Sequence, residues 1–280
     1  MEHFKESLKG LLPRDITKLI RFCKYAIQSR LDFNERVGFK YGFMDYDSAA
    51  NYVKNIGFTG YQEEIFVKKL VSASRGVRDG TFVYERDTVT FPTIQYSWPL
   101  LTALLYAVEE NQISVLDYGG GLGTTYRQNH KFLAGRGVKI CWKVLEQEAL
   151  VQIGRREFSN EELIFVASLD EEKTSPDIVI FGGSLCYLPR PWEVLQKTFE
   201  LSPKFIVFDR TPFVEGVEDL FAVQFVPPEI YSAALPIVSF SQGKFSEFME
   251  SKYSLIVNWI CDMQPDPKSV SRGSLWRLKN

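Results

Sequence analysis

The stretch from Val115 to Gly123 reads Val-Leu-Asp-Tyr-Gly-Gly-Gly-Leu-Gly, and it decides the fold. An apolar run that ends in an acid is typical of a buried strand. The glycines behind it permit a sharp turn and let the backbone lie against a ligand. A helix is expected to begin near Thr124. Strand, glycine loop and helix in this order predict the first unit of an α/β sheet with a nucleoside ligand at the loop.

Strand and helix patterns alternate on both sides of this loop. The apolar runs predict strands over 114–117, 139–145, 163–166, 177–181, 204–209, 254–261 and 274–278. Helical patterns stand at 100–110, 148–158, 191–201 and 244–251. Such alternation predicts a Rossmann-like, mostly parallel seven-stranded sheet with helices on both faces, in a domain spanning 96–280.

The first 95 residues have a different character. Leucines and isoleucines recur at helical spacing within 1–30, a second helical region runs over 45–69, and turn residues with β-branched runs over 76–94 suggest a hairpin. We expect residues 1–95 to form a helical N-terminal segment that caps the sheet domain and helps to build the acceptor site.

The spacing of the glycines favours one cofactor over another. A dinucleotide fingerprint needs its third glycine at position 124, but the sequence has it at Gly123. Asp117 would repel a diphosphate, whereas it can interact with the ammonium group of a methionine moiety, directly or through water. Asp117, with the loop glycines Gly119, Gly120, Gly121 and Gly123, therefore predicts S-adenosyl-L-methionine, with S-adenosyl-L-homocysteine as product.

Further cofactor contacts are expected where the following strands end. Glu146 closes the second strand, at the place where an acid accepts the ribose hydroxyls, and Glu148 competes with it for this role. The other predicted cofactor-binding residues are Gln147, which follows that acid, Ser168 and Leu169 at the adenine edge, Ser184 after the fourth strand, and Tyr126 on the helix behind the loop.

Composition and charge exclude several classes of function. Lys and Arg number 33 against 35 Asp and Glu, so the net charge of -2 gives no field for holding nucleic acid. The longest apolar run, 99–108, is half of the ~20 residues that span a bilayer. The four cysteines stand far apart and only two histidines are present, so we expect reduced thiols and no metal. No signal or transit sequence is evident, which predicts a cytoplasmic protein.

With these residues in view, the chain resembles class I methyltransferases, and more narrowly a family encoded in bacterial surface-polysaccharide (O-antigen and capsule) gene clusters. The resemblance spans about 40–230. The matching segments are Tyr-Gly-Phe at 41–43, Tyr-Glu-Arg-Asp at 84–87, Gln-Tyr-Ser-Trp-Pro-Leu-Leu at 95–101, the glycine loop with 125–129, Val-Leu-Glu-Gln-Glu at 144–148, and Asp-Arg-Thr-Pro-Phe at 209–213. It implies methyl transfer to a sugar nucleotide or glycan acceptor.

Catalysis of methyl transfer can come largely from alignment, but a hydroxyl acceptor benefits from a base. Asp209, at the end of the fifth strand, is the first candidate, with a loop-fixing network around Arg210 as the alternative. Tyr187 and His130 are further candidates. His130 shares a helix face with Tyr126, although a surface or helix-packing role is the favoured explanation for it and the resemblance implies an arginine at this position.

Acceptor contacts are predicted from four residues. Tyr96 and Trp98 precede the helix that leads into the first strand, where they either stack on a sugar ring or pack in the core. Arg210 stands beside the candidate base. Tyr231 lies in the insertion after the fifth strand and is a candidate lid residue.

Two other functions stay open on sequence alone. One is a nucleotide-dependent dehydrogenase that shares the sheet, and the other is a non-catalytic protein that binds the cofactor. The acceptor atom is not identified by any of these patterns, and a homodimer is an open possibility.

Overall fold

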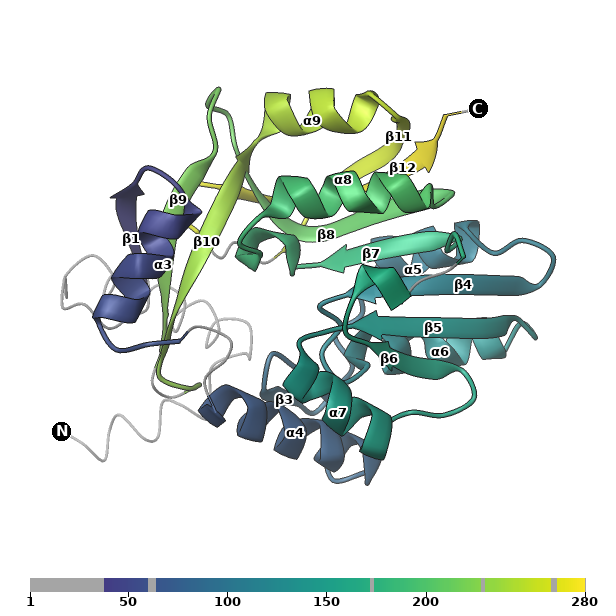
Figure 1. The fold of residues 1–280 in the computed structure, drawn as a ribbon. Helices are drawn as coiled ribbons and strands as arrows, with labels where there is room; N and C mark the ends of the chain where they lie inside the picture. Colours follow the sequence, from purple (N-terminus) through teal and green to yellow (C-terminus); the bar gives the residue numbers. More distant parts are fainter. Residues whose placement is uncertain (1–37, 60–63, 172–173, 228–229, 263–265, 280) are drawn as a thin grey trace, which may run out of the picture.

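The computed structural model describes residues 38–59, 64–171, 174–227, 230–262 and 266–279. The helices expected within 1–30 lie outside the described residues. Within them, one large sheet runs through the molecule and helices cover both of its faces (Figure 1).

The centre of the sheet is parallel. Its order is β6-β5-β4-β7-β8, and β12 follows antiparallel to β8 with β11 outside it. The predicted Rossmann-like α/β fold, with a parallel central sheet and helices on both faces, is confirmed. The strands are β4 (Gln112–Tyr118), β5 (Lys139–Leu145), β6 (Leu163–Val166), β7 (Ile178–Gly182), β8 (Phe205–Val214), β11 (Tyr253–Ile260) and β12 (Val270–Leu278).

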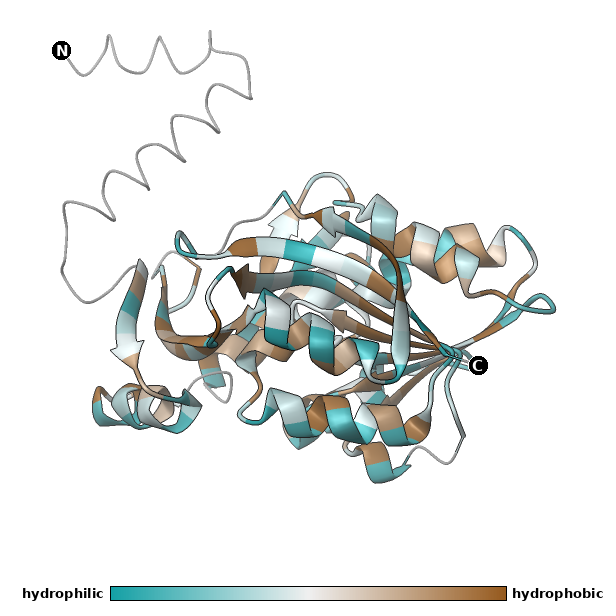
Figure 2. Cartoon of the chain, turned by 90° about the horizontal axis from the view of Figure 1, so that it is seen from above, coloured by the Kyte–Doolittle hydropathy of each residue, from teal (hydrophilic) through white to brown (hydrophobic). Residues whose placement is uncertain are grey.

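Side chains alternate along these strands between two hydrophobic cores. Val115 of β4 faces one core and Leu116 the other, which is why the strands read as continuous apolar runs. The first core holds α4 (Glu64–Arg78), α5 (Trp98–Tyr106), α6 (Thr124–Ala134) and α7 (Glu148–Glu157). The second holds α8 (Pro191–Leu201) and α9 (Gln242–Glu250). Figure 2 shows apolar strands between helices that carry polar positions as well.

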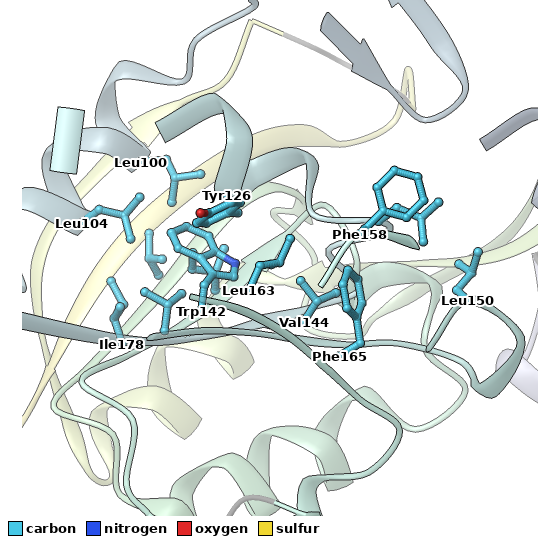
Figure 3. Close-up of a cluster of buried hydrophobic side chains, with 14 of the residues drawn as sticks. Leu100, Leu104, Tyr126, Trp142, Val144, Leu150, Phe158, Leu163, Phe165 and Ile178 are labelled. Carbon is cyan, nitrogen blue, oxygen red and sulfur yellow. The ribbon is translucent and has the colours of Figure 1, made fainter. Parts of the chain in front are cut away.

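Trp142 fills the middle of the first core. It is fully buried on β5, and Tyr126 of α6 meets it edge-on with ring centroids 5.8 Å apart. Figure 3 shows both rings among aliphatic side chains from α5, β6 and β7. This packing fixes α6, and with it the glycine loop, against the sheet.

The sheet is larger than the seven strands predicted. Three more strands extend it among the described residues: β1 (Gly38–Phe43), β9 (Leu220–Val226) and β10 (Ala233–Ser241). β8 is longer than β7. It pairs with β7 up to Asp209, and at Phe213 and Val214 the same edge of β8 pairs with β10. Helix α3 (Tyr46–Asn55) packs on this extension. The extension therefore stands beyond the carboxyl end of β7 (Figure 1).

Two sequence expectations need correction here. The segment before residue 96 was expected to be helical with a hairpin, yet it also contributes β1, which pairs with β9 from the other half of the chain. Tyr231, in the insertion after the fifth strand, was predicted as a candidate lid residue, yet most of this insertion is the β9–β10 pair and Tyr231 is buried. The expected hairpin within 76–94 is present as β2 (Tyr84–Arg86) and β3 (Val89–Phe91).

Candidate functional site

The glycine loop connects β4 to α6 at the carboxyl edge of the sheet. Gly119, Gly121 and Gly123 all have positive φ angles, of 72°, 60° and 90°. A Cβ on Gly119 would stand 2.6 Å from the Cβ of Ser184, so this residue also has no room for a side chain. At Gly121 the nearest atom would be 3.8 Å away, in Leu70 of α4. The loop thus presents bare backbone beneath α4, as a nucleoside cradle requires.

Asp117 lies under this loop and is only 1% exposed. Its Oδ2 accepts a hydrogen bond from the indole N–H of Trp142 at 3.3 Å, and a Cβ on Gly120 would stand 2.4 Å from that oxygen. Burial raises the pKa of Asp117 to about 7, although Trp142, Thr125 and Arg210 oppose the shift. The carboxyl group therefore supports the loop from below, and its predicted contact with a methionine ammonium stays a prediction.

Glu146 stands opposite the loop, as predicted. Its Oε1 accepts from the backbone N–H of Gly121 at 3.1 Å and its Oε2 from that of Gln147 at 2.9 Å. Burial raises its pKa to about 7, although both N–H groups act to lower it. The competing Glu148 is exposed and accepts from Gln152 on α7 at 3.1 Å. Of the two acids, Glu146 is the one held against the glycine loop.

Ser168 and Leu169 follow β6 and line a cavity of about 200 Å³. The backbone N–H of Asp170 donates to the Ser168 hydroxyl at 3.1 Å, which fixes this turn. The cavity reaches from the ends of β4 and β5 to the first turns of α8. Its other lining residues are Tyr118, Leu145, Ala167, Arg190, Glu193, Val194 and Lys197.

Ser184 and Tyr187 belong to the loop after β7, which contains the 3-10 turn η3 (Leu185–Tyr187). The Ser184 hydroxyl donates to the carbonyl of Tyr118, which joins this loop to the glycine loop. The Tyr187 hydroxyl donates to Gln224 of β9 at 2.7 Å. The cavity and the carboxyl edge of the parallel strands beside it form the crevice of this site. Ser184 and Tyr187 lie in a loop at this edge, and both are held by protein partners.

Asp209 and Arg210 lie where the pairing of β8 with β7 ends. Asp209 is 2% exposed, and its Oδ1 accepts from the indole N–H of Trp259 at 3.2 Å. Its Oδ2 is 3.6 Å from the guanidinium of Arg210, which also donates to the carbonyl of Gly182. Arg210 has a positive φ of 54°. This geometry matches the loop-fixing network, and the predicted role of Asp209 as a base stays without support.

Tyr126 and His130 share one face of α6, as predicted, but they do not face the glycine loop. The Tyr126 hydroxyl donates to Glu162 at 2.7 Å, and Nε2 of His130 is 2.9 Å from the same carboxylate. Glu162 directly precedes β6, so it stands at the amino end of that strand. The structure thus gives both side chains a partner away from the crevice, because α6 runs back along the sheet from the loop.

The predicted acceptor residues lie in two places. Tyr96 and Trp98 stack with ring centroids 4.8 Å apart, pack on Phe132 of α6, and leave Trp98 58% exposed. Tyr231, in contrast, is buried between β9 and β10, where its ring meets Phe66 of α4 with centroids 5.4 Å apart. Tyr231 therefore joins the sheet extension to the helix above the glycine loop, and Tyr96 and Trp98 form an outer surface.

Glu85 is a site residue that the sequence reasoning did not single out. It is 1% exposed on β2, and its carboxylate accepts from the hydroxyl of Thr124 in the first turn of α6 and from Ser74 at 3.3 Å. Arg127 lies 3.6 Å from the same oxygen and donates to the carbonyl of Leu122 at 2.7 Å. The protein thus places its own carboxyl group beside the start of α6, where a helix attracts anions.

Two absences concern the described residues as a whole. No group of three or more His, Cys, Asp or Glu side chains there is arranged to hold a metal ion. Among the helices of this part of the chain, none has both the length and the apolar character needed to cross a bilayer.

No protein-family model matches the chain, and no curated protein matches it. Solved structures resemble it distantly. The N-terminal domain of EvdMO1, crystallised in the presence of S-adenosylhomocysteine and D-fucose, is 12% identical, with 74% of this chain and 96% of that chain covered and a TM-score of 0.47. The 1,6-didemethyltoxoflavin-N1-methyltransferase of Burkholderia thailandensis, with its substrate and S-adenosylhomocysteine bound, is 14% identical, with 79% and 92% covered and a TM-score of 0.44.

Magnesium protoporphyrin IX methyltransferase from Synechocystis PCC 6803, with S-adenosylmethionine bound, is 11% identical. The alignment covers 86% of this chain and 100% of that chain, with a TM-score of 0.45. Likenesses at this level of identity carry no inference about activity or acceptor.

Proposed function

We propose that this protein is an S-adenosylmethionine-dependent methyltransferase. The observation that carries the proposal is the pairing of Glu146 with the glycine loop: a half-buried carboxylate at the end of β5 faces the bare backbone of Gly121. Backbone N–H groups and a carboxylate in this arrangement suit a nucleoside, because the carboxylate accepts both ribose hydroxyls. When bound, the cofactor supplies a methyl group on a sulfonium, which is activated for in-line displacement.

Glu85 supports this cofactor over a dinucleotide. A dinucleotide places its diphosphate at the start of the helix after the glycine loop, where the helix dipole attracts negative charge. Here Glu85 already bonds to Thr124 in that first turn, and Asp117 lies beneath the loop. Because Glu85, which is paired with Arg127, already occupies this anion-attracting position, a diphosphate would have to displace it, whereas a sulfonium nucleoside brings no phosphate. This favours the methyltransferase over the dehydrogenase-like alternative.

The residues of this site have separate tasks in such an enzyme. Glu146 and the loop glycines hold the nucleoside, and Ser168 with Leu169 lines the cavity next to it, which we assign to the adenine edge. Leu70 covers the loop from α4 and helps to exclude water. The acceptor that we propose is a hydroxyl or amine of a sugar nucleotide or glycan in surface-polysaccharide biosynthesis. That part of the proposal rests on the sequence resemblance.

Calorimetric titration tests the cofactor assignment. We expect the protein to bind S-adenosylhomocysteine and not NAD, and we expect Asp117→Ala to weaken binding severely, because the loop loses its support. The matched control is Asp177→Ala, which removes a carboxylate that bonds to Ser114 at the opposite edge of the sheet. The control should lower stability but keep the affinity. Binding of NAD without S-adenosylhomocysteine would establish the dehydrogenase-like alternative instead.

A product assay tests the activity itself. Purified protein is incubated with S-adenosylmethionine and either nucleotide sugars or extracted glycans, and release of S-adenosylhomocysteine is measured. Acceptor-dependent release identifies a catalyst. Tight cofactor binding with no release on any acceptor would point to the non-catalytic alternative.

A further inference from the structure

A second, smaller cavity lies apart from the crevice, between the first turn of α6, the β2–β3 hairpin and the end of α4. It has a volume of about 20 Å³ and shares no lining residue with the larger cavity. A cavity of this size holds one group as large as a water molecule or a hydroxyl. Its polar lining residues are Tyr84 and Glu85 of β2 and Thr124, Arg127 and Gln128 of α6.

Two of these polar side chains are incompletely paired. Glu85 is 1% exposed, and its Oε2 has no hydrogen-bond partner among the described residues. In the same part of the chain, Nη2 of Arg127 also lacks one, because it stands 3.6 Å from Oε1 of Glu85, too far for a hydrogen bond. Buried charged groups with unsatisfied atoms are costly. The residues around this cavity thus offer one acceptor and one donor to a group that enters it.

A hydroxyl group matches this pair. It donates one hydrogen bond, here to the Glu85 carboxylate, and it accepts others, here from the Arg127 guanidinium. An ionised phosphate or carboxylate has no proton to donate to Glu85, and an ammonium group cannot accept from Arg127. The charges on both protein partners strengthen the hydrogen bonds of a hydroxyl. The chemistry of the cavity therefore favours a hydroxyl over an ion.

An aromatic surface continues from the cavity along α6. Gln128 lines the cavity and donates to the carbonyl of Gln95, and Phe132 follows it one helical turn later on the same face. Tyr96 and Trp98 stack on each other, and both pack edge-on against Phe132. We call Tyr96, Trp98 and Phe132 the aromatic platform. The cavity and the aromatic platform are therefore neighbours on the surface of α6.

A sugar combines the chemistry of both places. One face of a pyranose ring presents C–H groups that pack on an aromatic ring, while its edge carries hydroxyls. Trp98 is 58% exposed, although large aromatic side chains are mostly buried. The ammonium group of Lys131, 5.0 Å from the centroid of the Tyr96 ring, adds a hydrogen-bond donor beside the aromatic platform. This surface suits a ligand that is apolar on its face and polar at its edge.

We propose that the cavity and the aromatic platform form a sugar-binding site, and that the methyl acceptor is a glycan chain of more than one sugar. The second part rests on the proposed function. Thr124 lines the cavity and directly follows the glycine loop, so the site begins beside that loop and leads away from it along α6. A chain whose end reaches the crevice places a further sugar here, with one hydroxyl in the cavity. A nucleotide sugar has no second sugar to place.

Saturation-transfer NMR with simple sugars tests the site without the true acceptor. The probes are D-glucose, D-galactose, L-rhamnose and N-acetyl-D-glucosamine, with uridine diphosphate as the nucleotide probe. We expect at least one sugar to bind with a Kd of about 1–10 mM, and Trp98→Ala to weaken that binding about ten-fold. Tyr106→Ala is the matched control, because Tyr106 is 51% exposed at the other end of α5. It should leave sugar binding unchanged.

Glu85→Gln tests the part played by the cavity. The variant keeps the size of the side chain and an oxygen for Thr124, but it loses the charge that strengthens the bond to a hydroxyl, so sugar binding should fall about 3- to 10-fold. Thermal unfolding checks that E85Q is folded, whereas W98A changes an exposed side chain and is not expected to disturb the fold. If folded E85Q binds sugar as well as wild type, no hydroxyl occupies the cavity and this part of the site is overturned.

The outcomes separate this inference from the proposed function, because binding of S-adenosylhomocysteine is measured on the same samples. If no sugar binds, or if W98A binds sugar as well as Y106A does, the sugar-binding site is overturned and the proposed function is untouched. If uridine diphosphate binds in place of the sugars and W98A abolishes it, the glycan chain is overturned. If sugar binds through Trp98 but the cofactor does not bind, the proposed function fails and the sugar-binding site remains.

A kinetic readout follows once an acceptor is in hand. W98A should raise the KM for a glycan chain about ten-fold while kcat and the KM for S-adenosylmethionine stay the same, because the aromatic platform binds the chain away from the reacting atoms. A fall in kcat with an unchanged KM for the glycan would contradict this role.

Discussion

The two halves of the crevice differ in how their charged groups are held. In the half around β4, β5 and β6, Asp117 and Glu85 are buried, Glu146 is half-buried, and all three are bonded to backbone, indole or hydroxyl partners. In the half around β7 and β8, Asp209 is buried against Trp259 and Arg210, and Arg210 is partly exposed with a positive φ angle. The first half is suited to binding one fixed ligand. The second half leaves part of a guanidinium accessible to a ligand.

The largest effect is expected at the boundary of the two halves, with Asp209→Asn. This change leaves the partly buried guanidinium of Arg210 without its carboxylate partner, and breaking such a pair costs about 3 kcal/mol of unfolding free energy. Urea denaturation measures the loss. Trp259→Phe is the control, since it removes only one hydrogen bond to Asp209 and should cost about 1 kcal/mol. If D209N is as stable as wild type but inactive, Asp209 would again be the candidate for the catalytic base.

The pH dependence of cofactor affinity tests the first half. Burial raises the pKa of Glu146 to about 7, so the group is mostly ionised at pH 8 and mostly neutral at pH 6. The ribose hydroxyls need an ionised acceptor, so affinity for S-adenosylhomocysteine should fall as pH drops below 7, by up to about ten-fold per pH unit. Calorimetry from pH 8 to pH 6 measures it.

Two variants sharpen this measurement. Glu146→Gln should bind weakly at pH 8 and show a shallower pH dependence, with a remaining slope from Asp117, whose pKa burial also raises to about 7. Glu148→Gln should leave the wild-type curve unchanged, because Glu148 is turned toward Gln152. A flat wild-type curve would mean that Glu146 does not bind the ribose as the carboxylate.

The smallest effect is expected at the hairpin turn, with Thr88→Gly. Glycine adopts the φ of 75° without the penalty that a β-branched residue meets there. The gain is partly offset by the greater freedom of glycine in the unfolded chain, so we expect about 0.5–1 kcal/mol of added stability. Thermal unfolding measures it. A loss of stability would show that the Thr88 side chain is not strained in this turn.

The first half of the crevice could be predicted from sequence because its parts are contiguous. The apolar run, Asp117 and the glycines stand together in the chain, and Glu146 follows at a regular distance, so one local pattern contains most of the geometry. Helix α8 was placed within its observed bounds because Pro191 marks its first turn.

The second half could not be predicted in the same way, because its parts come together only in the fold. Nothing in the sequence near Asp209 indicates that its carboxylate will accept a hydrogen bond from Trp259, fifty positions later. A signal for β1 was nevertheless present, since Phe39, Tyr41 and Phe43 alternate with residues that are more exposed. The apolar run of β10 contains Pro236, which argues against a central strand. The structure accommodates it because β10 pairs with β8 only at Phe240 and Ser241.

The continuity of β8 limits how a ligand can enter. β8 pairs first with β7 and then, along the same edge, with β10. The central sheet and the extension beyond it are therefore joined by one continuous strand. The α4 side is attached differently, through side chains such as Phe66 on Tyr231 and Lys69 on the carbonyl of Ile230. Movement of α4 away from the extension would break side-chain contacts of this kind, whereas movement on the other side would break backbone pairing of the sheet. We therefore expect a ligand to enter past α4.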